Sequence, residues 1–232
     1  MATQALFDIG NVILEPSPTF ARLKDKTRAW VPLLVLILLT LAITYWYVST
    51  LDFAWAREHL LAAQGGALKP EQRAAQEHFL TPNSMLWMSG IGIVLGTPVM
   101  FALTAVYYLL AGKVMGSSIG FGKWFGFAAW TSIPRLLALP LMALQIATSG
   151  GRLTMEDANM VSLNYLLLHL PLSSPWTSFA NSFDLTSLWT MALAAIGLKA
   201  WTGRSTAACT FVAVLPYVLI YGIWAAKIAF FG

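Results

Sequence analysis

The sequence predicts an all-α fold, a polytopic bundle of five transmembrane helices accompanied by short interfacial helices. Hydrophobic residues make up 58% of the 232 residues and charged residues only 10%, whereas a soluble domain carries about 25% charged residues. Five apolar segments also alternate with polar ones, and most of them approach the roughly 20 residues that cross a bilayer. A water-soluble core could not cover this much apolar surface, so the function must be sought in a membrane.

The chain divides into two predicted parts. Residues 1–28 are expected to form a cytoplasmic, amphipathic and basic N-terminal segment, and residues 29–232 the five-span membrane domain. Apolar residues recur at helical spacing between positions 5 and 14, which predicts a short amphipathic helix lying on the membrane. The proline-containing run at residues 15–18 interrupts this pattern.

Four cations alternate along the chain just before the first span: Arg22, Lys24, Lys26 and Arg28. We expect them to contact the membrane surface, because each cation near an anionic leaflet contributes about 1 kcal/mol. The alternative is a solvated flank that only sets the topology. Membrane lipids are thus expected partners, whereas nucleic acid is not, since the net charge of +4 is small and its cations sit at span ends.

The predicted spans cover residues 30–47, 85–110, 123–147, 185–200 and 206–230. Eight lysines and arginines flank these spans on one side, against four in the longer loops of the other side. The positive-inside rule therefore places the N-terminus in the cytoplasm, and an odd number of spans places the C-terminus outside. Tryptophans near the span ends, Trp124 and Trp201 among them, are expected to lie at the membrane boundary.

The outer loop at residues 51–83 is predicted to form two short helices divided at residues 64–66. It carries two pairs of residues with metal-ligand side chains, Glu58-His59 and Glu77-His78. Together with Glu156, Asp157 or His169, they could in principle assemble a metal site. Their spacing is not that of a known helical metal site. Neither a metal nor a cofactor is therefore expected.

Arg135 is the most unusual charged residue of the chain. If the third span enters the bilayer at Lys123, a rise of 1.5 Å per residue places Arg135 about 18 Å deep. A guanidinium at that depth needs a partner, a wet cavity or an anionic ligand, so an anion or lipid-headgroup site is one interpretation, beside a kink at Pro134. In the other interpretation, residues 119–133 form an aromatic interfacial helix and Arg135 is an inside flank.

The second span is longer than the hydrocarbon core, about 39 Å for residues 85–110 as a straight helix. A kink is expected at Thr97-Pro98, because Pro98 cannot donate a hydrogen bond to the preceding turn. Broken helices line transport sites in some membrane proteins. Thr97 and Pro98 therefore join Pro134 and Arg135 as candidate ligand- or lipid-binding residues.

Two pairs of glycines, Gly92 with Gly96 and Gly122 with Gly126, have the small-xxx-small spacing that lets helices approach closely. They predict either packing within the chain or a homo- or hetero-oligomer.

Motifs for catalysis are missing from the sequence. It contains no phosphate-binding loop, no H-E-x-x-H motif and no convincing pair of intramembrane carboxylates. Asp184 is the acid closest to the later spans, and we expect it to be the N-cap of a helix that begins at Leu185. An enzyme is therefore not expected.

The two ends of the chain resemble bacterial Yip1-domain membrane proteins. Residues 18–23 (PTFARL), which lead into the basic run, are similar to the start of that family. Residues 183–189 (FDLTSLW), followed by Gly197-Leu198, are similar to its fourth helix and the cytoplasmic turn after it. The resemblance covers almost the entire chain, and it implies a five-helix integral protein of the bacterial inner membrane with a cytoplasmic N-terminus.

In eukaryotic relatives, the resemblance further implies trafficking roles, contacts with prenylated small GTPases and hetero-oligomers. This sequence lacks the long acidic cytoplasmic region and the Asp-Leu-x-Gly-Pro motif of those relatives, so the GTPase role is not expected here. The expected function is a non-enzymatic one, organising the membrane or adapting partner proteins. The alternative is a small transporter, channel or lipid-handling protein with a site around Arg135.

Overall fold

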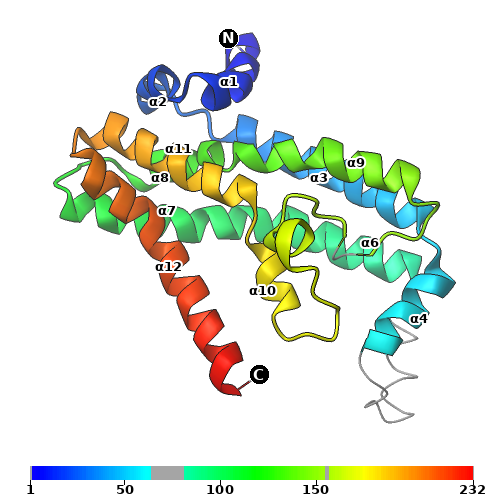
Figure 1. Ribbon diagram of the computed structural model, residues 1–232. Coiled ribbons are helices and arrows are strands. Elements are labelled where there is room, and N and C mark those ends of the chain that lie inside the picture. The colour runs from blue at the N-terminus through cyan, green and yellow to red at the C-terminus, as the bar shows by residue number, and fades with distance from the viewer. Residues whose placement is uncertain (1, 64–80, 155–156, 232) are drawn as a thin grey trace.

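A computed structural model of the protein describes residues 2–63, 81–154 and 157–231 (Figure 1). Within these ranges the chain forms helices and loops, with one isolated antiparallel bridge between Ser162 and Asp184. The predicted all-α class is confirmed. The second short helix predicted for the outer loop lies outside the described residues.

The helices follow one another in a simple order. The first four are α1 (Ala2–Leu14), α2 (Pro16–Asp25), α3 (Trp30–Thr50) and α4 (Phe53–Ala63). Next come two interrupted helices, α6 (Pro82–Ile91) with the π-helical η1 (Gly92–Gly96) and α7 (Thr97–Val114), then α8 (Phe121–Thr131) with the 3₁₀ segment η2 (Ile133–Ala138) and α9 (Leu139–Thr148). The last are the π-helical η3 (Asn164–Leu168), α10 (Thr177–Ser182), α11 (Leu185–Thr202) and α12 (Thr206–Phe231).

Four helices of the described chain are long and apolar enough to cross a membrane: Trp30–Thr50, Pro82–Val114, Phe121–Thr148 and Thr206–Phe231. They correspond to the predicted first, second, third and fifth spans. The predicted fourth span forms α11, which is not among these four. Its 18 residues include a lysine and several hydroxyl side chains, which lower its mean hydropathy. Two of these hydroxyl residues, Thr186 and Thr190, are buried.

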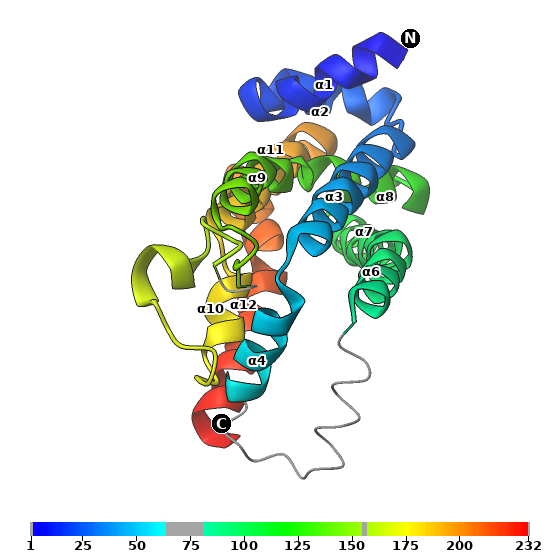
Figure 2. The same cartoon turned by 90° about the vertical axis from the view of Figure 1, so that its right-hand side faces the viewer.

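Most of the long helices lie side by side. Two views show α3, α6–α7, α9 and α11 packed together, whereas α12 leaves the bundle at an angle (Figures 1 and 2). In both views the pair α1 and α2 lies above the long helices, and α4 and the end of α12 lie below them. The termini of the described chain therefore lie on opposite sides of the bundle.

The irregular points of the two interrupted helices lie where proline was expected to act. The segment η1 directly precedes Thr97-Pro98, and η2 contains Pro134. Because proline withholds a backbone N–H, the regular hydrogen-bond ladder cannot continue through it. The sequence thus located both breaks, although not their π-helical and 3₁₀ geometry.

The core centres on aromatic side chains of α8, and this corrects the prediction for two tryptophans. Trp124 and Trp201 are 0% and 2% exposed, not at a lipid boundary. Their rings pack against each other with centroids 5.4 Å apart. Their indole N–H groups donate to the carbonyls of Ile119 and Phe20, at 3.1 and 2.8 Å. Because each polar atom finds a partner inside, neither ring needs the wet interface.

Asp52 fixes the junction between α3 and α4 to the loop after α9. Its carboxylate accepts hydrogen bonds from the Trp55 N–H at 3.1 Å and from Arg152 Nε at 3.3 Å. Its own N–H donates to the Gly151 carbonyl at 2.8 Å. The Trp55 N–H, and less strongly Arg152, hold the pKa of Asp52 below its ordinary value.

Candidate functional site

The helices α1 and α2, here called the N-terminal helical pair, are docked on the bundle. The helix α2 packs against α11, and α1 contacts α8 and η2. Phe20 and Leu23, on one face of α2, are 0% and 2% exposed. The Trp201 indole donates to the Phe20 carbonyl at 2.8 Å. Protein, and not lipid, therefore covers much of the apolar surface predicted for the N-terminal segment.

The segment that joins the helical pair to α3 is also fixed, against α8. The Trp130 indole N–H donates to the Thr27 carbonyl. Gly126 lies beside it so closely that an added Cβ would be 2.2 Å from Thr27 Cγ2. Only glycine permits this approach, since ordinary van der Waals contact begins near 3.5 Å. The helical pair is thus held by α11 at Phe20 and by α8 at Thr27.

An ion pair joins the two helices of the pair. Arg22 Nη2 lies 2.9 Å from Asp8 Oδ1, and Gln4 Nε2 donates to the same oxygen at 3.2 Å. Asp8 is buried on the inner face of α1, where a carboxylate requires hydrogen bonds. One of the four cations predicted to contact the membrane therefore already has a protein partner.

Three of those four cations border one small cavity. Arg22, Lys26 and Arg28 line a space of about 320 Å³ together with Asp8 and other residues of the pair. Lys24 does not line it. The structure thus gathers most of the basic run around one point, where anionic groups of the protein partly balance it.

The outer face of α1 remains apolar. Leu6, Phe7 and Leu14 are 59%, 64% and 78% exposed, whereas Ala5 and Val12 on the inner face are buried. A helix that is apolar on two faces has one of them left for a membrane or another protein. The predicted amphipathic pattern included Leu6 and Leu14 together with the buried residues, so it did not separate the two faces.

Arg135 lies in η2, and its side chain is exposed. It borders a pocket of about 300 Å³ formed by η2, α9, the loop after α9 and the first turn of α11. Within the described chain, no acidic oxygen lies within 4.0 Å of its guanidinium. The carboxylate of Asp184 lines the same pocket.

Asp184 caps α11, as the sequence predicted. Its Oδ1 accepts hydrogen bonds from the Ser187 N–H at 2.7 Å and from Thr186 Oγ1 at 2.8 Å. Asn159 Nδ2 also donates to Oδ2 at 3.1 Å. This last contact joins the loop after α9 to the start of α11, and no local pattern reveals it because 25 residues separate the two side chains.

Replacing Asp184 by alanine is expected to lower the free energy of unfolding by about 1–2 kcal/mol, because the first turn of α11 loses its cap. Asp184→Asn keeps an acceptor at the same place and is expected to retain most of the stability. The measurement is the apparent melting temperature of the purified protein in detergent. Asp157→Ala is the control, since the bond that the Asp157 carboxylate accepts from Thr154 is exposed. Equal melting temperatures for Asp184→Ala and Asp157→Ala would contradict the capping role.

The packing of α8 relates the position of Arg135 to the start of α3. Trp130 is hydrogen-bonded to Thr27, three residues before α3 begins at Trp30. Arg135 lies five residues beyond Trp130, which is about 8–10 Å at rises of 1.5–2.0 Å per residue. The backbone of Arg135 therefore lies about one helical turn beyond the start of α3, and its depth in a bilayer stays a prediction.

The other candidate ligand-binding residues do not join Arg135. Pro134 is fully buried, and neither Thr97 nor Pro98 borders the Arg135 pocket. These prolines shape their helices and lie apart from a common site.

The two glycine pairs differ in their surroundings. A Cβ added at Gly92, Gly96 or Gly122 would meet nothing within 4 Å, whereas at Gly126 it would meet Thr27 and Ala29. Packing within the chain therefore explains Gly126 alone. Gly92 and Gly96 stay candidates for contact with another helix.

Among the described residues, no three acidic, histidine or cysteine side chains come close enough to hold a metal ion. Glu77, His78 and Glu156 of the candidate ligand set lie outside the described residues.

Comparisons with known proteins agree with the membrane architecture. A family model described as the Yip1 domain matches residues 10–226. The chain is also similar to "Membrane protein YknW" of Bacillus subtilis (strain 168), with 25% identity over 210 residues, which cover 90% of this chain and 84% of the relative. No solved structure matches the chain significantly.

Proposed function

Because the chain belongs to the Yip1 domain family, we propose that it is a non-enzymatic integral membrane protein that organises its membrane and binds partner proteins through the N-terminal helical pair. One observation carries this proposal. The pair is docked on the bundle through Phe20 and Trp201, yet Phe7 and Leu14 of its outer face stay exposed. A helix held rigidly with an apolar face outward is suited to binding, because little ordering entropy remains to be lost.

The proposed topology has five crossings, a cytoplasmic N-terminus and an external C-terminus in a bacterial inner membrane. In this topology α11 is the additional crossing. Its 18 residues span about 27 Å, close to the hydrocarbon thickness of about 30 Å. The burial of Thr186 and Thr190 supports it, since polar side chains in a membrane helix face the bundle. Lys113 and Arg204 then lie on the side of the helical pair.

The test is photo-crosslinking in native membranes from benzoyl-phenylalanine placed at Phe7 or Leu14. We expect discrete protein adducts from both positions. The matched control is the same probe at Val106, which is 44% exposed on α7 and is expected to label only lipid. With the probe at position 7, Leu14→Asp is expected to remove the protein adduct, because it places a charge in the apolar face. Lipid adducts alone from positions 7 and 14 would contradict the adaptor role.

A flux measurement tests the same proposal against transport. Purified protein in liposomes is expected to move neither ions nor labelled lipids. Flux that the wild-type protein supports and Arg135→Ala abolishes would instead assign the protein to transport.

A further inference from the structure

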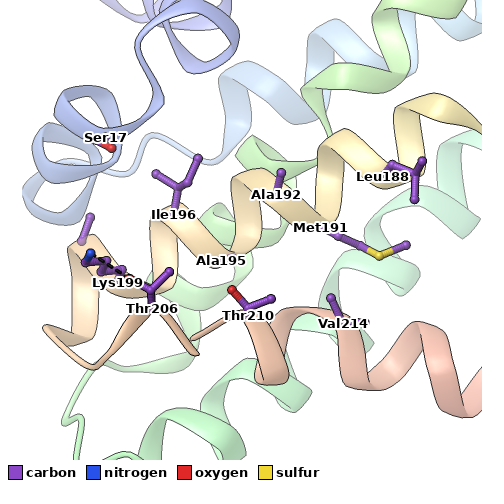
Figure 3. A pocket seen from close by; sticks show the side chains of 11 residues that line it. Ser17, Leu188, Met191, Ala192, Ala195, Ile196, Lys199, Thr206, Thr210 and Val214 are labelled. Carbon is purple, nitrogen blue, oxygen red and sulfur yellow. Dashed lines mark hydrogen bonds between the residues drawn. The ribbon is translucent and has the colours of Figure 1, made fainter. Parts of the chain in front are cut away.

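A wide groove runs between α11 and α12. Its volume is about 840 Å³, and Ser17 of α2 borders one end (Figure 3). The α11 wall consists of side chains that recur every three or four residues: Leu188, Met191, Ala192, Ala195, Ile196, Lys199 and Ala200. The α12 wall consists of Thr206, Thr210 and Val214, at a spacing of four.

Small side chains make the groove. Ala192, Ala195 and Ala200 project little from α11, so the two helices leave space between them although they are in contact. The groove is apolar from Leu188 to Ile196 and opens toward the surrounding medium. In a bilayer, this medium is lipid.

The end of the groove near the helical pair is cationic. Lys199 is exposed, and its Nζ donates to Thr206 Oγ1 at 2.9 Å. Because α12 begins at Thr206, the positive end of its dipole faces the same place. The hydroxyl of Ser17 completes a set of donors at this end (Figure 3).

We propose that this groove binds one anionic phospholipid from the leaflet on the side of the N-terminal helical pair. The phosphate lies at Lys199 and Thr206, and an acyl chain follows the alanines toward Leu188. Lys199 lies eleven residues after Leu188, a rise of about 16 Å along the helix, which is about half the hydrocarbon thickness and hence one leaflet. This site is separate from the partner-binding face of α1 and does not depend on it.

The cation decides between a lipid and a partner helix. Lipid tails are as apolar as leucine, so any acyl chain can fill the alanine-lined part, and this part selects nothing. Selectivity must come from the charged end, where Lys199 attracts a headgroup with a net negative charge and repels the cationic choline of a zwitterionic one. Basic pockets between membrane helices bind anionic headgroups in this manner. An apolar helix in the groove would leave Lys199 without an anionic counterpart.

The experiment is native mass spectrometry of the purified full chain, titrated with phosphatidylglycerol or with phosphatidylcholine of the same acyl chains. We expect preferential retention of phosphatidylglycerol. Lys199→Ala is expected to lower its affinity about fivefold, the equivalent of about 1 kcal/mol per cation, and Lys199→Arg to retain it. Ala195→Phe is expected to weaken both lipids, because it fills the groove. Lys113→Ala, in the last turn of α7, is the control and is expected to change nothing.

Two further arms identify the occupant. Soluble glycerol phosphate is not expected to displace the lipid, because it lacks the acyl chain. Single cysteines at Leu188 and Val214, in a Cys209→Ser background, are not expected to form a cross-linked dimer. The proposal is overturned if the two lipids bind equally, if Lys199→Ala and Ala195→Phe retain wild-type binding, or if the cysteines cross-link two copies. Variants are compared only where gel filtration shows an unchanged folded peak, and Ala192→Leu replaces Ala195→Phe if the latter misfolds.

Discussion

Replacing Phe20 with alanine is expected to detach the N-terminal helical pair and to lower the free energy of unfolding by about 3–5 kcal/mol. The Phe20 side chain is fully buried, with its ring centroid 5.6 Å from that of Phe127. Gly197 lies against both rings, since an added Cβ there would be 2.6 Å from Phe127 and 3.0 Å from Phe20. Because the neighbouring side chains are packed this closely, they cannot move into the cavity that Phe20→Ala would leave. The loss of stability is therefore expected to include the full cavity term.

Hydrogen exchange in detergent measures this outcome. In Phe20→Ala, backbone amides of α2 are expected to exchange faster, whereas those of α7 and α8 stay protected. Phe7→Ala is the matched control, because that ring is 64% exposed and its loss leaves no cavity. Unchanged protection of α2 in Phe20→Ala would mean that other contacts hold the helical pair.

The predictable part of the fold is the part that depends on local sequence. The long apolar runs predicted four of the spans because a membrane helix satisfies all its backbone groups by itself. Pro98 and Pro134 located the two interruptions because the missing donor acts within one turn. Asp184 was identifiable as a cap for the same reason, since its acceptor meets N–H groups only three residues away.

The features that the sequence did not reveal depend on residues far apart in the chain. Trp201 is buried because its N–H reaches the Phe20 carbonyl, 181 residues away. From the sequence, Trp201 could not be distinguished from an interfacial anchor, because it is a tryptophan near the end of a predicted span. The amphipathic pattern of residues 5–14 predicted a helix lying on the membrane, whereas protein covers its inner face in the structure.

The candidate sites follow the same division. The basic run was visible in the sequence. The ion pair between Arg22 and Asp8 was not, because it forms only when the turn between α1 and α2 brings the two helices together. The groove at Lys199 was not recognisable, because its two walls come from different helices and alanines carry no signal of their own. Arg135 was identified by its charge. Its pocket could not be predicted, because Asp184 comes to line it only when the start of α11 packs near η2 and α9.

Introducing a single methyl group at Gly126 is expected to destabilise the protein by about 1–3 kcal/mol, because overpacking forces neighbouring atoms apart. The Cβ of Gly126→Ala would lie 2.2 Å from Thr27 Cγ2 and 3.2 Å from the Cβ of Ala29. Thr27 cannot yield easily, since its carbonyl accepts the hydrogen bond from the Trp130 indole. The methyl group therefore acts as a wedge between α8 and the segment that leads into α3.

Gly122→Ala is the matched control, one helical turn earlier on α8 with nothing within 4 Å of its added Cβ. It is expected to leave stability unchanged or to raise it by up to about 1 kcal/mol, because alanine is the better helix former. Combining Gly126→Ala with Thr27→Ser removes the clashing Cγ2 and is expected to recover part of the loss. The apparent melting temperatures of the four proteins, wild type included, decide the matter. If Gly126→Ala and Gly122→Ala behave alike, or if Thr27→Ser recovers nothing, then the close contact between α8 and Thr27 does not fix the helical pair.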